Sequence, residues 1–314
     1  MTKANPSTAP KRSAQSGKRP SIALALGGGG ARGLAHIPML EVFDELNIRP
    51  KVIGATSIGA IFGAAYASGL KASEIRVHTE QLFSRRSEIA RQVLGARAEP
   101  LQRVFSVFQM RSSLLSAEKL LENILPTGTA QTFADLKIPM RILATDYYTQ
   151  EEVVLRTGNL RQAVAASMAL PALFKPISFW DHLLIDGGLV NPLPFDVVAP
   201  EADLVVAIDV SGAGHAAIKR KTPTAFEALV ASSQIFQNSI VREKLRSRQP
   251  DILINMDVGE FYLLDFFKTE KILEAAEPAK DVLRNQLKRI LAAETLEEQP
   301  EPIGCPASGP ASTK

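Results

Sequence analysis

Residues 51–60 read Lys51-Val52-Ile53-Gly54-Ala55-Thr56-Ser57-Ile58-Gly59-Ala60, a short apolar run that leads through small residues to a serine and then into Ala, Gly and Ile. A serine on a sharp strand-to-helix turn needs small neighbours two positions away on each side, which is why such nucleophile elbows follow the pattern G-x-S-x-G. Gly59 meets this requirement, and Ala55 replaces the first glycine. The segment therefore predicts a strand, an elbow at Ser57 and a helix.

The segments around this elbow alternate between strand and helix patterns. Residues 22–26 form a continuous apolar run, as expected for a parallel strand that is buried on both faces. A glycine-rich loop, a helix over 34–46 and then the elbow strand and its helix follow. This order predicts an α/β fold whose parallel sheet has helices on both faces. Further strands are expected at 140–146, 152–156, 203–210 and 252–256, extended chain at 177–185, and helices at 72–125, 160–168, 222–248 and 268–293.

Composition limits the class of protein. The chain has 314 residues, of which 46% are hydrophobic, enough for one large domain or two modest ones. Its formal net charge of +3 is smaller than the clustered basic excess of nucleic-acid-binding domains. The single cysteine, Cys305, cannot form an internal disulfide, so a reducing compartment suits the chain. The uncharged stretch 52–70 consists largely of Ala, Gly, Ser and Thr, which favours a buried helix over a membrane span.

The glycine run supports two interpretations. Gly28, Gly30 and Gly33 match the dinucleotide fingerprint G-x-G-x-x-G between a strand and a helix. That fingerprint needs an acidic residue at the end of the second strand to hold a ribose, but this strand ends at the elbow serine. The backbone N–H groups of successive glycines near a helix N-terminus also form a nest for negative charge. Beside Ser57 such a nest is an oxyanion hole, with Arg32 either adding positive charge or pinning the loop.

A serine nucleophile needs a base, and two kinds of residue are available. Of the four histidines, only His182 and His215 have plausible positions, and neither lies in the setting of a conventional triad. Asp186 ends an apolar extended segment and precedes two glycines that let the backbone approach another loop. A carboxylate serves directly as base when partial burial raises its pKa. We therefore favour Asp186, although Asp-Gly-Gly taken alone is typical of a plain turn.

Three motifs at expected strand ends follow one another: Gly28-Gly29-Gly30-Ala31-Arg32-Gly33, Ala55-Thr56-Ser57-Ile58-Gly59 and Asp186-Gly187-Gly188. In this order they resemble the patatin-like phospholipase family. The surrounding segments agree with it: Gly33-Leu34-Ala35-His36, Gly63-Ala64-Ala65-Tyr66-Ala67-Ser68-Gly69, Ala166-Ser167-x-x-Leu170-Pro171 and Asn191-Pro192-Leu193-Pro194. The resemblance covers residues 21–212 and extends toward 290. Within the family, the chain is similar to bacterial single-domain members and to the catalytic domain of neuropathy target esterase.

The resemblance implies a three-layer α/β/α patatin-like fold with a mainly parallel central sheet, and a carboxylic ester hydrolase such as a phospholipase or lysophospholipase. It implies a Ser–Asp dyad of Ser57, the nucleophile, and Asp186, the base and proton acceptor, without metal or cofactor. It assigns the remaining site residues by motif: Gly28, Gly29, Gly30 and Arg32 to the oxyanion hole, Ala55 and Gly59 to the elbow, and Gly187 and Gly188 to the Asp-Gly-Gly motif. Two departures are Ala55 itself, which we expect to be tolerated, and Pro38, where members often carry glycine and where the following helix is expected to bend.

The expected partners are a membrane phospholipid or other acyl-lipid substrate and a transient anionic membrane surface, with no nucleotide or nucleic acid. Residues 1–20 are expected to be a disordered basic arm, 21–294 the hydrolase domain and 295–314 a disordered tail. Residues 84–111 contain six arginines but only two glutamates, interleaved with apolar residues. This composition fits either a solvated helical insertion or an interfacial lid. We expect a cytoplasmic protein that also acts peripherally at the inner face of the membrane. The alternative is a catalytically weak hydrolase fold that serves as a lipid-binding or regulatory module.

Overall fold

The computed structural model describes residues 19–94, 115–212, 222 and 225–297. The arm predicted over 1–20 and the tail predicted over 295–314 therefore lie almost wholly outside the described residues. The basic segment 84–111 is described only to Leu94, as the end of a helix. His215 also falls outside the described ranges. Residues 295–297 continue the final helix.

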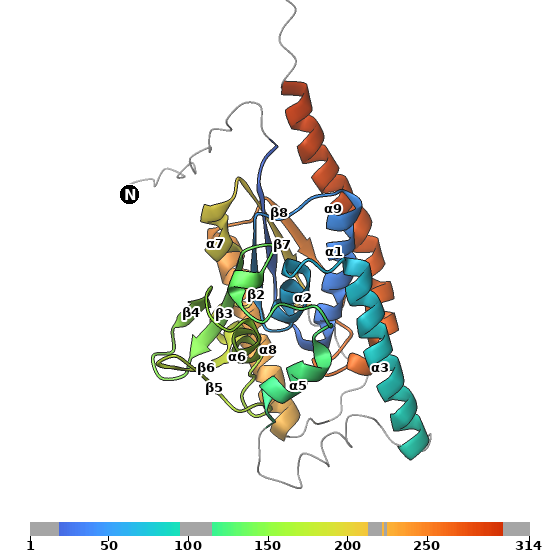
Figure 1. Ribbon diagram of the computed structural model, residues 1–314, viewed down its shortest axis with the longest axis vertical. Coiled ribbons are helices and arrows are strands. Elements are labelled where there is room, and N and C mark those ends of the chain that lie inside the picture. The colour runs from blue at the N-terminus through green and yellow to red at the C-terminus, as the bar shows by residue number, and fades with distance from the viewer. Residues whose placement is uncertain (1–18, 95–114, 213–221, 223–224, 298–314) are drawn as a thin grey trace, which may run out of the picture.

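One mixed sheet forms the centre of the described structure (Figure 1). Its strand order is β5-β6-β3-β2-β1-β7-β8, and β4 pairs with β3 outside this order. Strands β3, β2, β1, β7 and β8 are parallel, whereas β4 and β6 are antiparallel to β3, and β5 is antiparallel to β6. The strands are β1 (Ile22–Leu26), β2 (Val52–Thr56), β3 (Met140–Asp146), β4 (Glu152–Leu155), β5 (Ile177–Phe179), β6 (His182–Asp186), β7 (Leu204–Asp209) and β8 (Ile252–Asn255). The predicted α/β fold with a mainly parallel sheet is confirmed.

Helices cover the sheet on both faces, and the alternation of large and small residues in β1 shows how (Figure 1). Ile22, Leu24 and Leu26 belong to the larger hydrophobic cluster, which includes residues of α1, α2, α3, α6 and α9. Ala23 and Ala25 belong to a smaller cluster with residues of α7 and α8. The α-helices are α1 (His36–Glu45), α2 (Ile58–Ala67), α3 (Ala72–Leu94), α5 (Ala117–Ile124), α6 (Leu160–Ser167), α7 (Phe195–Val198), α8 (Ala225–Ser247) and α9 (Thr269–Glu297).

Short 3₁₀ helices connect several of these elements. They are η1 (Gly30–Ala35), η2 (Phe133–Asp135), η3 (Gly187–Leu189), η4 (Ala199–Glu201) and η5 (Phe266–Lys268). The helix predicted over 34–46 thus begins as η1 and continues as α1. Pro38 lies in the first turn of α1, the position where a missing N–H group costs a helix least.

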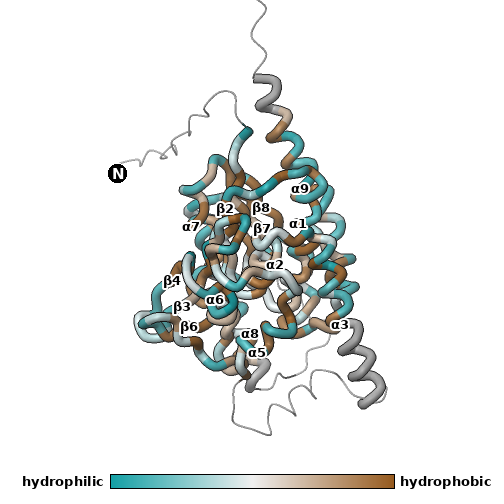
Figure 2. Tube along the Cα trace, viewed as in Figure 1, coloured by the Kyte–Doolittle hydropathy of each residue, from teal (hydrophilic) through white to brown (hydrophobic). Residues whose placement is uncertain are grey.

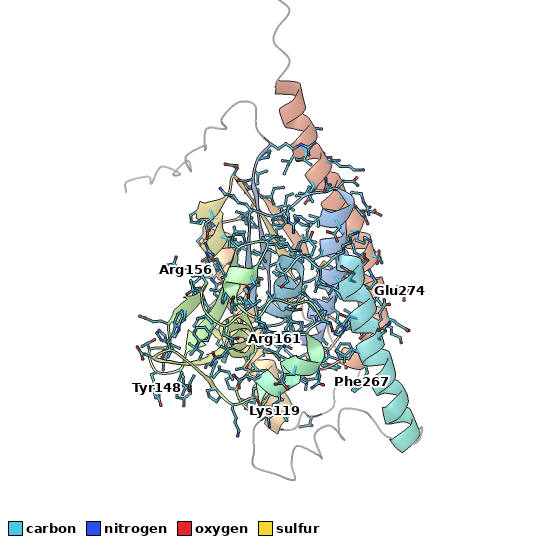
Figure 3. The ribbon with its side chains drawn as sticks, viewed as in Figure 1. Lys119, Tyr148, Arg156, Arg161, Phe267 and Glu274 are labelled. Carbon is cyan, nitrogen blue, oxygen red and sulfur yellow. The ribbon has the colours of Figure 1, made fainter. Side chains whose placement is uncertain are left out.

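The interior is apolar and the periphery is mixed. Figure 2 shows hydrophobic residues on the central strands and alternating hydrophobic and hydrophilic residues along the outer helices. All five residues of β1 and all five of β2 are buried, as parallel strands between two helical layers require. At the edges lie exposed side chains such as Tyr148, in the turn after β3, and Glu274, on α9 (Figure 3).

Candidate active site

Ser57 occupies the sharp turn between β2 and α2. Its backbone has φ 53° and ψ −121°, an unusual conformation for a residue with a side chain. A Cβ atom at position 59 would overlap the carbonyl group of Leu26, so only glycine fits there. Ala55 is fully buried in β2, and its methyl group is accommodated. The elbow expected from the sequence is therefore present, with Ser57 half-buried at its apex.

Asp186 ends β6 and meets Ser57 directly. The Ser57 hydroxyl donates to Asp186 Oδ2 at 2.8 Å, and the Gly188 N–H donates to the other carboxylate oxygen, Oδ1, at 2.7 Å. Asp186 is buried, with 3% of its surface exposed. Burial raises the pKa of Asp186 to about 6, and the hydrogen bonds from Gly188 and Ser57 oppose this rise. The carboxylate is thus more basic than an ordinary aspartate.

The strand register explains how residues 129 positions apart come together. In β3, Leu143 pairs with Thr56 at the end of β2, and the next residue, Ala144, pairs with Asp186 at the end of β6. Strand β4 also pairs with both Leu143 and Ala144 and so occupies the opposite side of β3. Consequently β2 and β6 share one side of β3 and run head-on toward each other. Their ends, Ser57 and Asp186, meet there.

The glycine loop approaches the elbow from β1. The Gly28 N–H donates to Pro192 O at 2.9 Å and so already has an acceptor. A Cβ atom at position 29 would lie 2.8 Å from Val210 O, and Gly30 has a positive φ of 59°. Gly29 and Gly30 therefore hold backbone conformations and contacts that side chains would disturb. A Cβ atom at position 28 would lie 3.4 Å from Ser57 Cβ, so this loop lies directly beside the serine.

Arg32 pins this loop from within. Its guanidinium is buried and donates from Nη1 to Ser211 O, while its Nε has no partner. Burial lowers the pKa of Arg32, and the charge of Asp209 partly opposes this. Of the two roles that the sequence left open for Arg32, these contacts match the pinning role.

One protein-family model matches the sequence of this chain. The model described as "Patatin-like phospholipase" matches residues 24–199, more than half of the chain. The chain belongs to the patatin-like phospholipase family. The resemblance inferred from the three motifs is thereby confirmed.

The similar curated proteins are much longer than the matched region. An uncharacterised NTE family protein of Mycobacterium tuberculosis is 31% identical over 194 residues, which cover 62% of this chain and 50% of that protein. Patatin-like phospholipase domain-containing protein 7 of Rattus norvegicus is 35% identical over 193 residues, 60% of this chain and 14% of that protein. The solved structure of VipD from Legionella pneumophila matches more loosely, with a TM-score of 0.44 and 12% identity over 84% of this chain and 66% of that chain.

The described histidines of this patatin-like protein have partners other than Ser57. His36 is fully buried against Gly27 O at 2.8 Å, and burial lowers its pKa to about 4. His78 contacts Ile124 O at 2.9 Å. His182 pairs with Asp146 at 2.6 Å, at the opposite end of β6 from Asp186. Asp186 is therefore the group bonded to the Ser57 hydroxyl.

Lys244 of α8 braces the segment that follows the Asp-Gly-Gly motif. Its ammonium donates to Asn191 Oδ1 at 2.6 Å, Leu193 O at 2.9 Å and Asp196 Oδ1 at 2.5 Å. The Thr56 hydroxyl reaches the same segment and donates to Asn191 O at 2.8 Å. Sequence reasoning gave Lys244 no role, because a lysine among the several charges of a helix carries no signal of burial.

In the ranges that the structure describes, no three His, Cys, Asp or Glu side chains gather as metal ligands would. None of the described helices has the length and apolarity needed to cross a membrane.

Proposed function

We propose that this protein is a serine lipid acyl hydrolase that cleaves carboxylic ester bonds of (lyso)phospholipids or related acyl esters. The observation that carries the proposal is the 2.8 Å hydrogen bond from the Ser57 hydroxyl, on a strained elbow, to the buried Asp186 carboxylate. Membership of a phospholipase family supports a lipid substrate.

In this proposal Ser57 Oγ attacks the ester carbonyl carbon while Asp186 Oδ2 accepts the hydroxyl proton. Collapse of the tetrahedral intermediate expels the alcohol, which takes that proton from Asp186. Water then attacks the acyl-enzyme with Asp186 again as base, and the fatty acid leaves as Ser57 regains its proton. A group with a pKa of about 6 suits this work, because it is mostly ionised at pH 7 and is still a stronger base than an ordinary aspartate.

The developing oxyanion needs hydrogen-bond donors beside Ser57. Because the Gly28 N–H is engaged by Pro192 O, we assign the oxyanion hole to the amides of Gly29 and Gly30. Gly28 then sets the distance between this loop and the serine, and Arg32 holds the loop against Ser211. Removing one such donor typically lowers turnover about 100- to 1000-fold.

We further propose that the protein works at a lipid surface through residues 228–241 of α8. This segment packs its buried Gln237 near Gly188, next to the dyad. From Ala228 to Val241 it carries no charged residue, although a solvent-facing helix normally does. Leu229, Ile235 and Phe236 are 53%, 62% and 62% exposed. An uncharged apolar surface beside an acyl-transfer site fits contact with acyl chains.

Covalent labelling tests the catalytic proposal. A fluorophosphonate probe should label the wild type and fail to label Ser57→Ala, and only the wild type should release fatty acid from a membrane lipid extract. The wild type and Ser57→Ala should unfold at the same temperature, so that a loss of labelling reflects the missing nucleophile and not unfolding. A wild type that binds vesicles but takes up no probe would favour the lipid-binding module instead.

A further inference from the structure

The turn at the end of α6 contacts both members of the dyad. Ser167, the last residue of α6, is fully buried. Its hydroxyl oxygen accepts from the Ser57 N–H at 2.8 Å and donates to Leu143 O of β3 at 2.6 Å. Two residues later, Ala169 O accepts from the Asp186 N–H at 3.0 Å. One three-residue turn therefore bonds the backbone of the serine and the backbone of the carboxylate.

These bonds address a specific weakness of the elbow. A non-glycine residue with positive φ carries strain of about 1–3 kcal/mol and keeps that conformation only where the surroundings enforce it. Ser57 is such a residue, with φ 53°. Without Ser167, its half-buried N–H would lose its acceptor and Leu143 O would lose a donor, so the peptide on the N-terminal side of Ser57 would be free to rotate.

The turn is itself held on a rigid element. The Asn159 side chain caps the start of α6 by accepting from Gln162 N at 3.0 Å, and Leu160 N donates to Gln131 O at 2.9 Å. Along the helix, Leu160, Ala163 and Val164 are fully buried in the main core. A site is most precise when the residues that support it are fixed in this way.

We propose that Ser167 is a positioning residue that holds the Ser57 backbone so that its Oγ stays within hydrogen-bond distance of Asp186 Oδ2, with Ala169 O fixing the other partner. This inference rests on the proposed hydrolase function. It also gives the Ser57 N–H a structural acceptor, so this N–H is not a donor to the oxyanion, in keeping with the assignment of the hole to Gly29 and Gly30.

Ser167→Ala tests the inference, because it removes the hydroxyl and leaves Ser57, Asp186 and the glycine loop intact. We expect kcat on a soluble short-chain ester and the rate of fluorophosphonate labelling to fall about 10- to 100-fold, with KM changed less than about twofold, since a misplaced reacting group costs rate rather than binding. Ser167→Cys is nearly isosteric and keeps a weak donor and acceptor, so it should recover part of both rates.

Thr79→Val is the matched control. Thr79 is a buried residue of α3 whose hydroxyl also donates to a carbonyl, Ile75 O at 2.7 Å. This variant should lose a comparable amount of thermal stability and keep wild-type kcat and labelling rate. If Ser167→Ala is labelled at the wild-type rate, or if both variants lose rate only in proportion to their unfolded fraction, the inference is wrong while the hydrolase assignment stands. An unlabelled wild type would overturn the assignment itself, and the inference with it.

Discussion

Burial makes the carboxyl group of Asp186 more basic, and it also lowers the stability of the folded state at neutral pH. Its pKa of about 6 lies above the ordinary value of 3.8, so the folded protein binds this proton more tightly than the unfolded chain does. The stabilisation that results is complete below pH 3.8 and is lost as pH rises to about 6. At neutral pH the protein therefore carries an ionised, largely desolvated carboxylate that reduces its stability.

Asp186→Asn should separate activity from stability. Esterase activity should fall on the order of 1000-fold or more, because residues that act as one unit fail together. The melting temperature should rise above that of the wild type at pH 8, and the difference should vanish near pH 4, where the wild-type carboxyl is protonated. Thermal unfolding at the two pH values measures this. A variant less stable than the wild type at pH 8 would contradict the burial argument.

The same pKa sets the acid limb of activity. Because the base must be ionised to accept the Ser57 proton, kcat/KM on a soluble ester should decline below about pH 6 with a slope of one proton. Assays restricted to short times keep acid unfolding out of the profile. Activity that persists unchanged to pH 4.5 would exclude Asp186 as a base of raised pKa.

His36 acts on stability in the opposite direction within the same pH range. Its pKa is lowered to about 4 from 6.5 by burial, so its contribution to stability is present above pH 6.5 and is lost as pH falls toward 4. Stability of the wild type between these values is thus a sum of opposing terms. In Asp186→Asn the Asp186 term is gone, and the melting temperature should fall more steeply with acid than in the wild type.

Gly29→Val tests the glycine loop. A side chain there would meet Val210 O at 2.8 Å and Val210 Cγ2 at 2.9 Å, and would push the loop away from Ser57. Turnover should fall at least about 100-fold, the typical effect of losing an oxyanion donor. Neither NAD nor ATP should raise the melting temperature of the wild type. A saturable nucleotide shift that the variant lacks would return the loop to the dinucleotide interpretation.

The sequence predicted which residues form much of the site, but it did not predict the contacts between them. Ser57 and Asp186 were named because an elbow and an Asp-Gly-Gly turn leave local patterns. Ser167 was visible only as part of a family segment without a role, because its bond to Ser57 joins positions 110 apart. The engagement of Gly28 by Pro192 O was equally hidden. Contacts of this kind depend on tertiary geometry that no local pattern encodes.

At the scale of elements, the parallel strands were predicted best. The runs at β1, β2, β3, β7 and β8 are apolar because helices cover both of their faces. Strands β5 and β6 were expected only as one extended segment over 177–185, and partly exposed residues interrupt the apolar pattern of β4, β5 and β6. That β4 and β6 occupy opposite sides of β3, and so align Asp186 with Ser57, became apparent only from the register.

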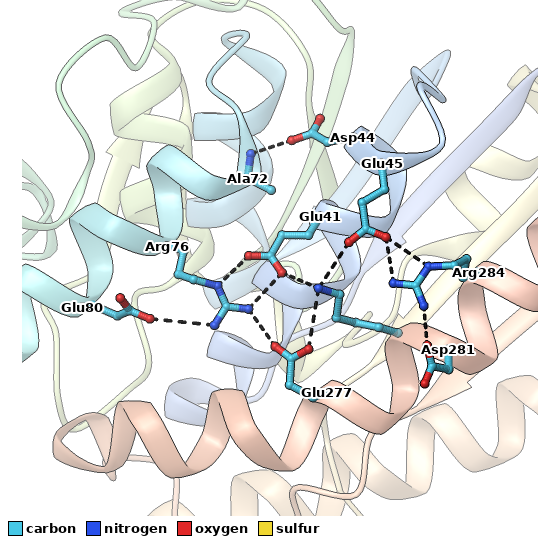
Figure 4. A network of polar contacts seen from close by, with 10 residues as sticks. Glu41, Asp44, Glu45, Ala72, Arg76, Glu80, Glu277, Asp281 and Arg284 are labelled. Carbon is cyan, nitrogen blue, oxygen red and sulfur yellow. Dashed lines mark hydrogen bonds and ion pairs between the residues drawn. The ribbon is translucent and has the colours of Figure 1, made fainter.

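Polar contacts between helices supplement the core at one face. Glu41 of α1 accepts from Arg76 of α3 at 2.5 Å and from Lys280 of α9 at 2.8 Å, in a network that extends to Glu277, Glu45 and Arg284 (Figure 4). The side chains of Glu41, Arg76 and Lys280 are only 16%, 22% and 14% exposed. Because its members are partly buried, such a network contributes more to the free energy of unfolding than isolated surface pairs do.

Glu41→Gln should therefore lower the free energy of unfolding by about 1–2 kcal/mol, because Arg76 and Lys280, both half-buried, lose the carboxylate that balances their charge. Urea unfolding measures the change. The matched control is Glu243→Gln, which breaks the pair with Arg246 whose side chains are 73% and 71% exposed. That variant should change stability by less than about 0.5 kcal/mol. Equal effects would mean that the network adds nothing beyond its separate pairs.

At the scale of the whole molecule, two surfaces are candidates for membrane attachment, and they differ in physics. The basic segment 84–111 is known here from its sequence, since the structure describes it only to Leu94. Its attraction to anionic lipid would amount to about 1 kcal/mol for each basic residue near the surface, and salt would screen it. Residues 228–241 of α8 are uncharged and include exposed apolar side chains, so their contact with lipid would be insensitive to salt.

Salt therefore distinguishes the two surfaces in one experiment. Replacing Ile235 and Phe236 with Asp should reduce binding to phosphatidylcholine vesicles at least about tenfold at both 0.05 and 0.5 M salt, because two charges must then enter the interface. Replacing Arg97 and Arg103 with Glu should reduce binding to anionic vesicles at low salt only. Vesicle cosedimentation measures both effects.

Val282→Asp is the control for the apolar surface, because Val282 is 49% exposed on α9 and lies outside α8. It should bind vesicles like the wild type. All three variants should hydrolyse a soluble short-chain ester at nearly the wild-type rate, since the dyad is untouched. The α8 variant could instead bind vesicles normally and be a monomer where the wild type is a dimer. In that case this face joins two copies of the chain. If it loses activity on soluble and bilayer substrates equally, α8 supports the dyad and not the membrane contact.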